Sequence, residues 1–210
     1  MQTIVFAGSK RGAGKTTLAI ELAVCAGHAM ILDLHPQHIV TGWAQRRGSD
    51  WPAVQSVEVD GLVDALESAR SSEFRWVFVD TSATAHPEVI TAAIKAANLV
   101  LIPSHPGSLD LTTLRGIVRL IPKERESAIV LNACIPFGGG IRNQLLRQAF
   151  REAHRYGLPV APCVVAERDE FPRAFDRGCA VMESEPDSKA AADILRLWNW
   201  LAREAEVLVA

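Results

Sequence analysis

The sequence predicts an α/β protein whose sheet is mostly parallel and is covered by helices on both faces. Short apolar runs alternate with helix-like segments along the chain, and these runs are continuous instead of alternating with polar residues. A continuous apolar run is typical of a strand that is buried on both faces, as in a parallel sheet. The alternation of strands and helices supplies the crossover connections that parallel strands require.

The predicted elements follow one another along most of the chain. The strands are residues 3–7, 30–34, 76–79, 99–102, 129–131 and 160–165. The helices are residues 16–26, 61–70, 87–97, 109–120, 141–156 and 187–205. Residues 42–59 are the least regular part, and we expect a surface excursion there with a short strand at 57–59.

Size and composition fit a single globular domain over residues 1–210. Of the 210 residues, 49% are hydrophobic and 22% are charged, which excludes a disordered chain. The formal net charge is −2, so any contact with nucleic acid must come from a local basic patch. No apolar stretch is long enough to span a bilayer, and the first apolar run has no basic flank of the kind that signal peptides carry. We therefore expect a cytoplasmic protein.

The strongest functional signal is a glycine-rich loop, residues 9–17, between the first predicted strand and the first predicted helix. Gly12 and Gly14 let the backbone N–H groups turn toward phosphate oxygens, and the helix adds the positive end of its dipole. Lys15 is expected to reach the β- and γ-phosphates, and the Thr16 hydroxyl to bind Mg²⁺. The expected nucleotide contacts are Lys10, Arg11, Gly12, Ala13, Gly14, Lys15, Thr16 and Thr17. The alternative is a glycine-rich turn with a surface lysine.

Two aspartates stand at the carboxyl ends of predicted strands, the edge where open α/β sheets bind ligands. Asp80 follows the apolar run 76–79, which has the form of a Walker B strand, and its carboxylate is expected to hold Mg²⁺ through water. Asp33 ends the run 30–34 and is a second candidate for supporting the metal site. For each aspartate the alternative is a helix cap or a surface turn.

The glycine-rich loop resembles the deviant Walker A motif of the ParA/MinD family of P-loop ATPases. The pattern Lys-x-Gly-x-Gly-Lys-Thr starts at Lys10, and in that family the first lysine crosses a dimer interface to the partner's nucleotide. The resemblance implies a P-loop NTPase fold, ATP or ADP with Mg²⁺ as cofactors, and an ATP-dependent homodimer. Ser9 stands where the strict P-loop pattern has a glycine, and Arg11 replaces a glycine that is common in the family.

Residues 33–37, Asp-Leu-His-Pro-Gln, resemble the switch I motif Asp-x-Asp-Pro-Gln of ParA proteins. His35 stands where that family has an aspartate that is needed for hydrolysis and helps to orient the attacking water. A neutral imidazole could accept a hydrogen bond from water and act as a base near pH 7, or hydrolysis could be very slow. The alternative to a catalytic role is that His35 is a surface histidine in a loop. The resemblance implies that the catalytic residues are Lys10, Lys15, Asp33 and His35.

The resemblance extends over nearly the whole chain and is greatest to the small ParF-like plasmid partition ATPases. The segments that carry it beyond switch I are residues 41–43, 98–103, 106–111, 175–178 and 188–192. Asn132 matches a position that contacts adenine in the family, and Arg168 lies in the following adenine-side loop. Asn132 could instead cap a turn, and Arg168 could be a solvated arginine.

The predicted helix 141–156 carries a basic face. Arginines recur every four residues opposite Leu145, Ala149 and Ala153, so their side chains would lie on one side of the helix. The candidate DNA-binding residues are Arg142, Arg147, Arg151 and Arg155. Such a stripe would bind phosphates without reading bases. A solvated basic face is the alternative, and a second candidate patch comprises Arg115, Arg119, Lys123 and Arg125.

These observations leave functions of different classes to compare. The leading hypothesis is a ParA-type ATPase that dimerises with ATP, binds non-specific DNA on the nucleoid and acts with a ParB-like or small centromere-binding partner to segregate plasmid or chromosomal DNA. The second is a non-catalytic nucleotide switch that positions a conjugation complex or another protein cargo. The third is a dethiobiotin synthetase-like ligase. No membrane binding is expected, because the C-terminal tail carries Glu204 and Glu206 and no terminal lysine cluster.

Overall fold

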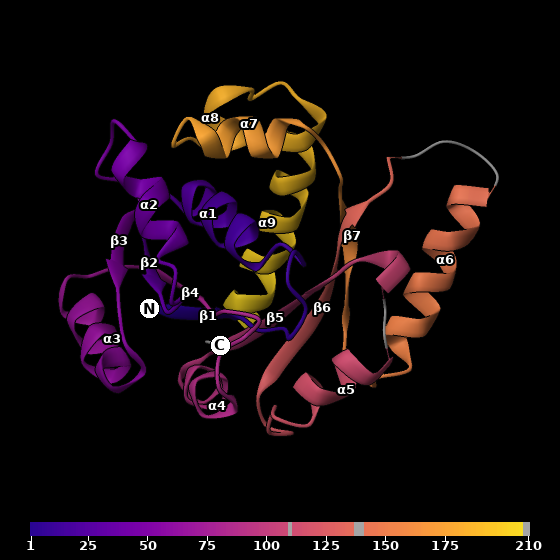
Figure 1. Cartoon of the computed structure of the whole chain (residues 1–210), viewed down its shortest axis with the longest axis horizontal. Coiled ribbons are helices and arrows are strands. Elements are labelled where there is room, and N and C mark those ends of the chain that lie inside the picture. Colours follow the sequence, from indigo (N-terminus) through magenta and orange to yellow (C-terminus); the bar gives the residue numbers. More distant parts are fainter. Residues whose placement is uncertain (109–110, 137–140, 208–210) are drawn as a thin grey trace.

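The chain folds around a parallel β-sheet with helices on both faces (Figure 1). The computed structural model describes residues 1–108, 111–136 and 141–207. Within these residues the sheet has seven strands in the order β3-β2-β4-β1-β5-β6-β7, and the paired strands are parallel. The predicted fold class is therefore confirmed.

The helices and strands have the following bounds. The strands are β1 Gln2–Phe6, β2 Ala29–Asp33, β3 Ala53–Ser56, β4 Trp76–Asp80, β5 Leu99–Ser104, β6 Glu126–Cys134 and β7 Val160–Ala166. The helices are α1 Lys15–Ala26, α2 Ile39–Arg46, α3 Leu62–Ser71, α4 Pro87–Ala96, α5 Leu111–Val118, α6 Ile141–His154, α7 Glu170–Asp176, α8 Val181–Ser184 and α9 Lys189–Val207. Short 3₁₀ turns occupy Val59–Gly61 and Pro106–Ser108.

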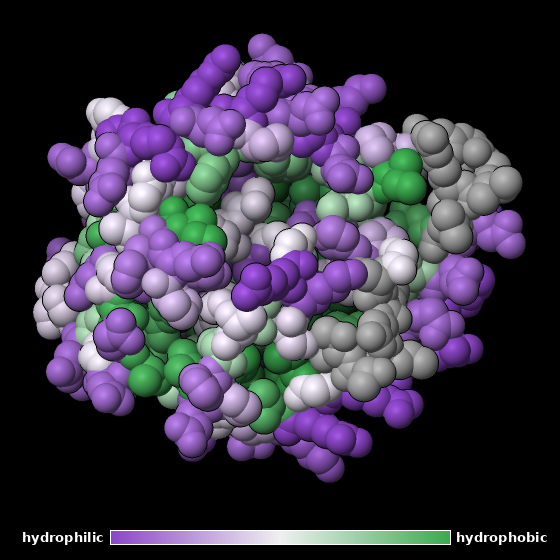
Figure 2. All heavy atoms as spheres, viewed as in Figure 1, coloured by the Kyte–Doolittle hydropathy of each residue, from purple (hydrophilic) through white to green (hydrophobic). Residues whose placement is uncertain are grey.

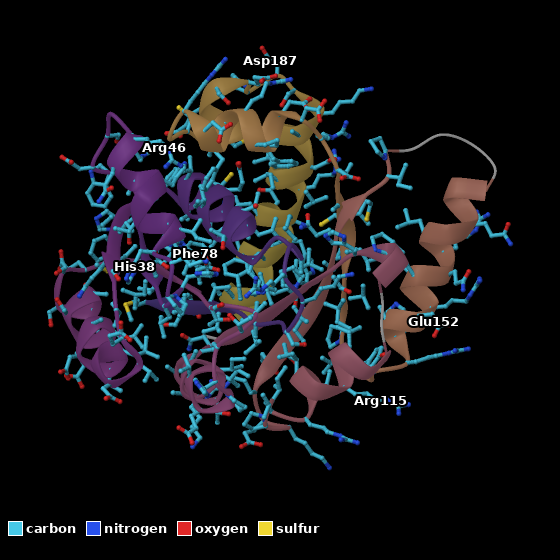
Figure 3. All side chains as sticks on the ribbon, viewed as in Figure 1. His38, Arg46, Phe78, Arg115, Glu152 and Asp187 are labelled. Carbon is cyan, nitrogen blue, oxygen red and sulfur yellow. The ribbon has the colours of Figure 1, made fainter. Side chains whose placement is uncertain are left out.

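A separate hydrophobic core lies on each face of the sheet. Along β1, Ile4 and Phe6 belong to the core beneath α1, α2, α7, α8 and α9, whereas Val5 and Ala7 belong to the core beneath α3, α4, α5 and α6. Figure 3 labels Phe78 of β4, which lies in the interior among the first group of helices. Because successive side chains of each central strand enter different cores, every position must be apolar. This burial explains the continuous apolar runs in the sequence.

The structure corrects the prediction for residues 42–59. Residues 42–46 are not part of a surface excursion, because α2 covers Ile39–Arg46 and buries Val40 and Trp43 against the sheet, whereas residues 48–51 are exposed as predicted. The short edge strand lies at Ala53–Ser56, not at residues 57–59. A helix of eight residues shows only two turns of periodicity, and here its stability comes from tertiary packing.

The last helix, α9, packs against the body of the protein. Its residues Ile194, Leu197, Leu201 and Ala205 are buried, and Trp198 meets the ring of Trp76 edge-on with 4.9 Å between ring centroids. The helix predicted at residues 187–205 is therefore present, and it begins at Lys189. Among the described residues, no helix has the length and apolar character needed to cross a membrane.

A buried glutamate joins α1 to the start of α8. The Glu21 carboxylate accepts hydrogen bonds from the Val181 backbone N–H at 3.0 and 3.2 Å. Burial raises the pKa of Glu21 to about 8, the Val181 N–H opposes the rise, and the negative charge of Glu183 adds to it. In the folded chain the carboxyl group therefore keeps its proton at pH values where the unfolded chain has lost it.

We expect Glu21→Gln to stabilise the protein increasingly between about pH 4.5 and pH 8. A raised carboxyl pKa contributes stability that is present below the unfolded pKa and is lost as pH rises through the folded pKa. The amide keeps an oxygen for the Val181 N–H but has no charge to desolvate, so the gain should reach on the order of 3 kcal/mol at pH 8. Urea unfolding of both proteins across this range measures it, with exposed Glu67→Gln as control. A difference that does not change with pH would contradict the expectation.

Candidate nucleotide-binding site

A cavity of about 620 Å³ lies at the carboxyl ends of β1, β2 and β4, which are neighbours in the sheet. Its walls come from the glycine-rich loop with the start of α1, from the loop that follows β2, from the loop that follows β4, and from α7. The parallel order of the strands brings these separate segments of sequence to one edge. A cavity therefore lies at the edge of the sheet where the sequence predicts the nucleotide site.

The glycine-rich loop is held in place by side chains from the other half of the sheet. The Asn132 side-chain N–H donates to the Ala13 carbonyl at 2.8 Å, and His105 Nε2 lies 2.8 Å from the Gly12 carbonyl. Gly14 has a φ of +95°, and a Cβ built on it would lie 2.0 Å from Asn132 Nδ2. Asn132, expected at the adenine, thus lies against the loop backbone, and sequence reasoning did not assign a role to His105.

Lys15 is buried in the loop, and its Nζ donates to the Lys10 carbonyl at 3.2 Å. Burial lowers the pKa of Lys15, although the negative charge of Asp80 partly opposes this effect. Burying an ammonium group beside a single carbonyl acceptor costs free energy, and an anion bound next to the group would reduce that cost. The side chains of Lys10 and Arg11 are exposed at the same loop.

Thr16, which lines the cavity, bonds the buried carboxylate of Asp80. The Thr16 hydroxyl donates to Asp80 Oδ2 at 2.7 Å, while the buried Oδ1 has no hydrogen-bond partner among the described residues. Burial raises the pKa of Asp80 to about 7, the Thr16 bond and the Lys15 charge act against the rise, and Asp33 adds to it.

This pair of oxygen ligands fits Mg²⁺. The ion prefers hard oxygen ligands and usually takes one or two from protein and the rest from water and phosphate. In the described part of the chain, no cluster of three or more His, Cys, Asp or Glu side chains could hold a metal. An ion held by Thr16 and Asp80 would therefore take its remaining ligands from water and from the phosphates of a nucleotide. Its positive charge would offset the free-energy cost of burying the Asp80 carboxylate.

Asp33 fixes the loop that follows β2. Its Oδ1 accepts the His35 backbone N–H at 3.0 Å, and its Oδ2 accepts both the backbone N–H and the hydroxyl of Thr41 at 2.9 and 3.0 Å. The carboxylate is fully buried and both of its oxygens are used within the loop and α2. This geometry favours a positioning role for Asp33 over the predicted direct contact with metal.

His35 lines the cavity in the loop that Asp33 fixes. Its Nδ1 accepts the Gln37 backbone N–H at 3.2 Å. Burial lowers the pKa of His35, and the positive charges of Lys15 and Arg11 lower it further while Asp33 opposes them. These effects favour the neutral form of the imidazole.

A further wall of the cavity comes from α7, which supplies the apolar side chains of Phe171, Pro172 and Phe175. Phe171 and Pro172 were not singled out from the sequence, and Phe175 entered only as part of the segment 175–178 that carries the resemblance. The aromatic pair at i, i+4 directly follows the predicted adenine-side loop. Arg168, expected at the adenine, instead donates from Nε to the buried carboxylate of Asp193 at 3.1 Å and does not line the cavity.

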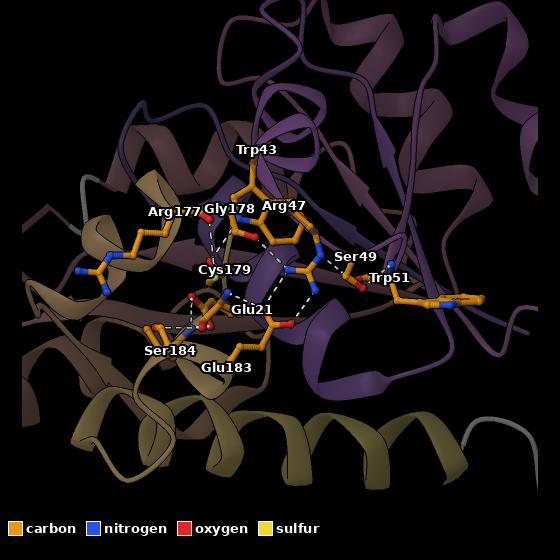
Figure 4. Close-up of polar contacts among 12 residues, drawn as sticks. Glu21, Trp43, Arg47, Ser49, Trp51, Arg177, Gly178, Cys179, Glu183 and Ser184 are labelled. Carbon is orange, nitrogen blue, oxygen red and sulfur yellow. Dashed lines mark hydrogen bonds and ion pairs between the residues drawn. The ribbon is translucent and has the colours of Figure 1, made fainter.

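The C-terminal end of α2 is clamped to the turn between α7 and α8 (Figure 4). The Arg47 guanidinium forms a bidentate pair with Glu183 at 2.6 and 2.9 Å, and also donates to the Gly178 carbonyl at 3.0 Å. It lies over the Trp43 ring, whose indole N–H donates to the Cys179 carbonyl at 3.2 Å. We call this set of contacts the Arg47 clamp.

The basic face predicted on helix 141–156 is exposed on α6. Arg147, Arg151 and Arg155 are exposed, whereas Ala149 and Ala153 are buried. Arg155 pairs with Glu152, which Figure 3 labels on α6, and Figure 2 shows hydrophilic residues along that edge of the molecule. The side chains of Arg142 and Leu145 lie outside the described part. In the second candidate patch, the Arg125 guanidinium donates hydrogen bonds to the carbonyls of Ala97 and Lys95. This side chain therefore stabilises the end of α4.

Comparison with known proteins places the chain in a family. The model of the family described as VirC1 protein matches residues 1–207. The chain belongs to the VirC1 family. Protein virC1 of Rhizobium radiobacter is 29% identical to it over 194 residues, 85% of this chain and 82% of that protein. Protein ParA of the same organism is 32% identical over 133 residues, 60% of this chain and 59% of that protein.

The fold of this VirC1-family chain is that of the MinD and ParA P-loop ATPases. Its structure superposes on the septum site-determining protein MinD of Pyrococcus horikoshii, solved with Mg-ADP, with a TM-score of 0.73 and 16% identity, covering 99% of this chain and 98% of that one. The predicted kinship with ParA/MinD ATPases is confirmed. The VirC1 branch itself was not foreseen from the sequence.

Proposed function

We propose that this VirC1-family chain is one nucleotide-binding domain that binds ATP with Mg²⁺ and works as an ATP-dependent homodimer in partition or positioning. The observation that carries the proposal is that Lys15 and Thr16 line one open cavity and that Thr16 bonds the buried Asp80. A buried lysine and a buried carboxylate oxygen without a hydrogen-bond partner among the described residues both cost stability, and a magnesium-bound phosphate would relieve both.

Each residue has a defined task in this proposal. The loop N–H groups and Lys15 hold the β- and γ-phosphates, and Lys10 reaches the nucleotide of the partner protomer. Thr16 and Asp80 would hold Mg²⁺, which supplies neutralisation of phosphate charge. Asp33 positions the loop that carries His35. The apolar wall of α7 faces the remaining part of the cavity and suits the base.

Non-specific DNA and a small ParB-like or centromere-binding protein are the partners that we propose for the dimer, which would place it on the nucleoid in the cytoplasm. The exposed arginines of α6 support the DNA contact, since they form one basic face and a dimer doubles it. The chain's kinship with ParA of Rhizobium radiobacter supports the partition role.

A non-catalytic positioning switch is the second candidate, and His35 is the observation that favours it. The loop that should orient the attacking water has an imidazole in place of the aspartate that the ParA resemblance implies. Such a protein would cycle by nucleotide exchange and could serve conjugation or another protein cargo. The match to the VirC1 family favours both of these candidates over a ligase of the dethiobiotin synthetase kind.

Sedimentation with ADP, ATP and a non-hydrolysable ATP analogue tests the proposal. We expect a dimer with ATP or the analogue and a monomer with ADP. Lys10→Ala should bind nucleotide as a monomer, because the side chain that would cross to the second protomer is gone. Lys95→Ala, at an exposed lysine of α4, is the matched control and should dimerise. A nucleotide-bound monomer in every case would contradict the proposal.

Adding non-specific duplex DNA at two salt concentrations extends the same experiment. The ATP-bound dimer should bind, and an Arg147→Ala, Arg151→Ala double variant should bind more weakly with a shallower salt dependence, by about one unit of slope per lost phosphate contact. Equal binding by both proteins would remove α6 as the DNA surface while leaving the nucleotide switch intact.

A further inference from the structure

The hydrogen bonding of His35 defines which ring nitrogen carries the proton. A backbone amide can only donate, so the Gln37 N–H bond requires a lone pair on His35 Nδ1. The neutral ring then carries its proton on Nε2. This side chain thus presents a hydrogen-bond donor, not an acceptor, as its one remaining polar group.

The ring is also held at the phosphate end of the cavity. Asp33 accepts the His35 backbone N–H, and Thr41 fixes Asp33 from the first turn of α2. His35 lines the same cavity as Lys15 and Arg11, and both of these cations act electrostatically on the ring. In the proposed complex these two cations lie beside the phosphates, the most negatively charged part of a nucleotide, so His35 would face the same groups.

We propose that His35 contacts the γ-phosphate of ATP through its Nε2–H and does not serve as the base for the attacking water. This inference rests on the proposed function, because it needs ATP in the cavity. An aspartate at this position would accept a hydrogen bond from water, whereas the Nε2–H cannot accept one. His35 therefore reports the presence of the γ-phosphate and makes the chain prefer ATP to ADP.

Three substitutions of His35 place a hydrogen-bond donor, no polar group, or a hydrogen-bond acceptor at this position, so that their effects can be compared. His35→Gln places an amide N–H near the position of Nε2, so the preference for ATP over ADP should stay within about threefold of the wild type. His35→Ala removes the donor and should reduce the preference about tenfold, the size of one hydrogen bond to a charged group. His35→Asp sets a carboxylate beside the γ-phosphate, so the preference should fall further while single-turnover hydrolysis of bound ATP becomes faster.

Titration calorimetry with Mg²⁺ and either ADP or a non-hydrolysable ATP analogue measures the preference. The matched control is His38→Gln, since His38 lies in the same loop but bonds Ser56 outside the cavity; it should keep the wild-type preference. ADP affinity should change little in all variants, because His35 contacts the phosphate that ADP lacks.

Two results would overturn the inference while leaving the proposed function in place. One is a His35→Gln variant that loses the preference as fully as His35→Ala. The other is an ATP preference kept by His35→Gln together with single-turnover hydrolysis reduced to that of Lys15→Ala, which would assign His35 the role of base. Failure of the wild-type chain to bind either nucleotide would instead refute the proposed function.

Discussion

Gly178→Ala is expected to lower the free energy of unfolding by about 3 kcal/mol, from a strained backbone and a steric overlap together. Gly178 has a φ of +69°, and a Cβ there would lie 2.6 Å from the Arg46 carbonyl carbon and 2.7 Å from the Arg47 backbone nitrogen. Backbone atoms cannot rotate away as a side chain can. The overlap would push α2 off the turn between α7 and α8 and break the Arg47 clamp.

Gly157→Ala is the matched control, because Gly157 has a φ of +72° with nothing within 4 Å of an added Cβ. It carries the backbone strain without the overlap and should cost about 1 kcal/mol. Denaturant unfolding of the three proteins, followed by far-ultraviolet circular dichroism, gives both values. Equal losses at the two glycines would show that the close approach of α2 to Gly178 does not contribute.

Lys15→Met is expected to weaken ATP binding by about 100-fold or more while leaving the nucleotide-free protein at least as stable as the wild type. Two charge-assisted hydrogen bonds to phosphate account for the loss of affinity. Stability is spared because burial in the empty site disfavours the charged form of Lys15, which lowers its pKa. Methionine fills a similar volume and carries no charge to desolvate.

Parallel calorimetry and thermal unfolding in the absence of nucleotide test the two halves of this expectation. Lys95→Met is the control at an exposed lysine and should change neither the affinity nor the melting temperature. A Lys15→Met protein that binds ATP normally would refute the assignment of the cavity. One that unfolds at a clearly lower temperature would show that the bond from Lys15 to the Lys10 carbonyl outweighs the cost of burying the charge.

Local signals were enough to predict the sheet and the phosphate-binding loop. Strands buried on both faces leave continuous apolar runs, and the loop needs its glycines, Lys15 and Thr16 within a few consecutive positions. Asp80 could be predicted because parallel strands end at a common edge, and its neighbour Thr16 confirms that placement.

The parts that the sequence did not reveal depend on contacts between distant residues. The helix α2 is too short to show clear periodicity, and its Trp43 bonds Cys179, 136 positions away. Asn132 bonds a carbonyl of the loop 119 positions away, and Arg168 is turned from the cavity by Asp193, 25 positions away. From the sequence alone, aromatic residues such as Phe171 are expected to pack in the core, and only the structure shows that they line a cavity.

The helix α2 is tied at both ends, to Asp33 at its start and to the α7–α8 turn through the Arg47 clamp at its end. It connects two walls of the same cavity, the His35 loop and α7, because α7 carries Phe175, whose carbonyl accepts a hydrogen bond from Arg46. A displacement of the His35 loop that reaches α2 is therefore passed on to the apolar wall. If ATP binds as proposed, this path through the protein links the loop beside the phosphates to the wall beside the base without passing through the nucleotide.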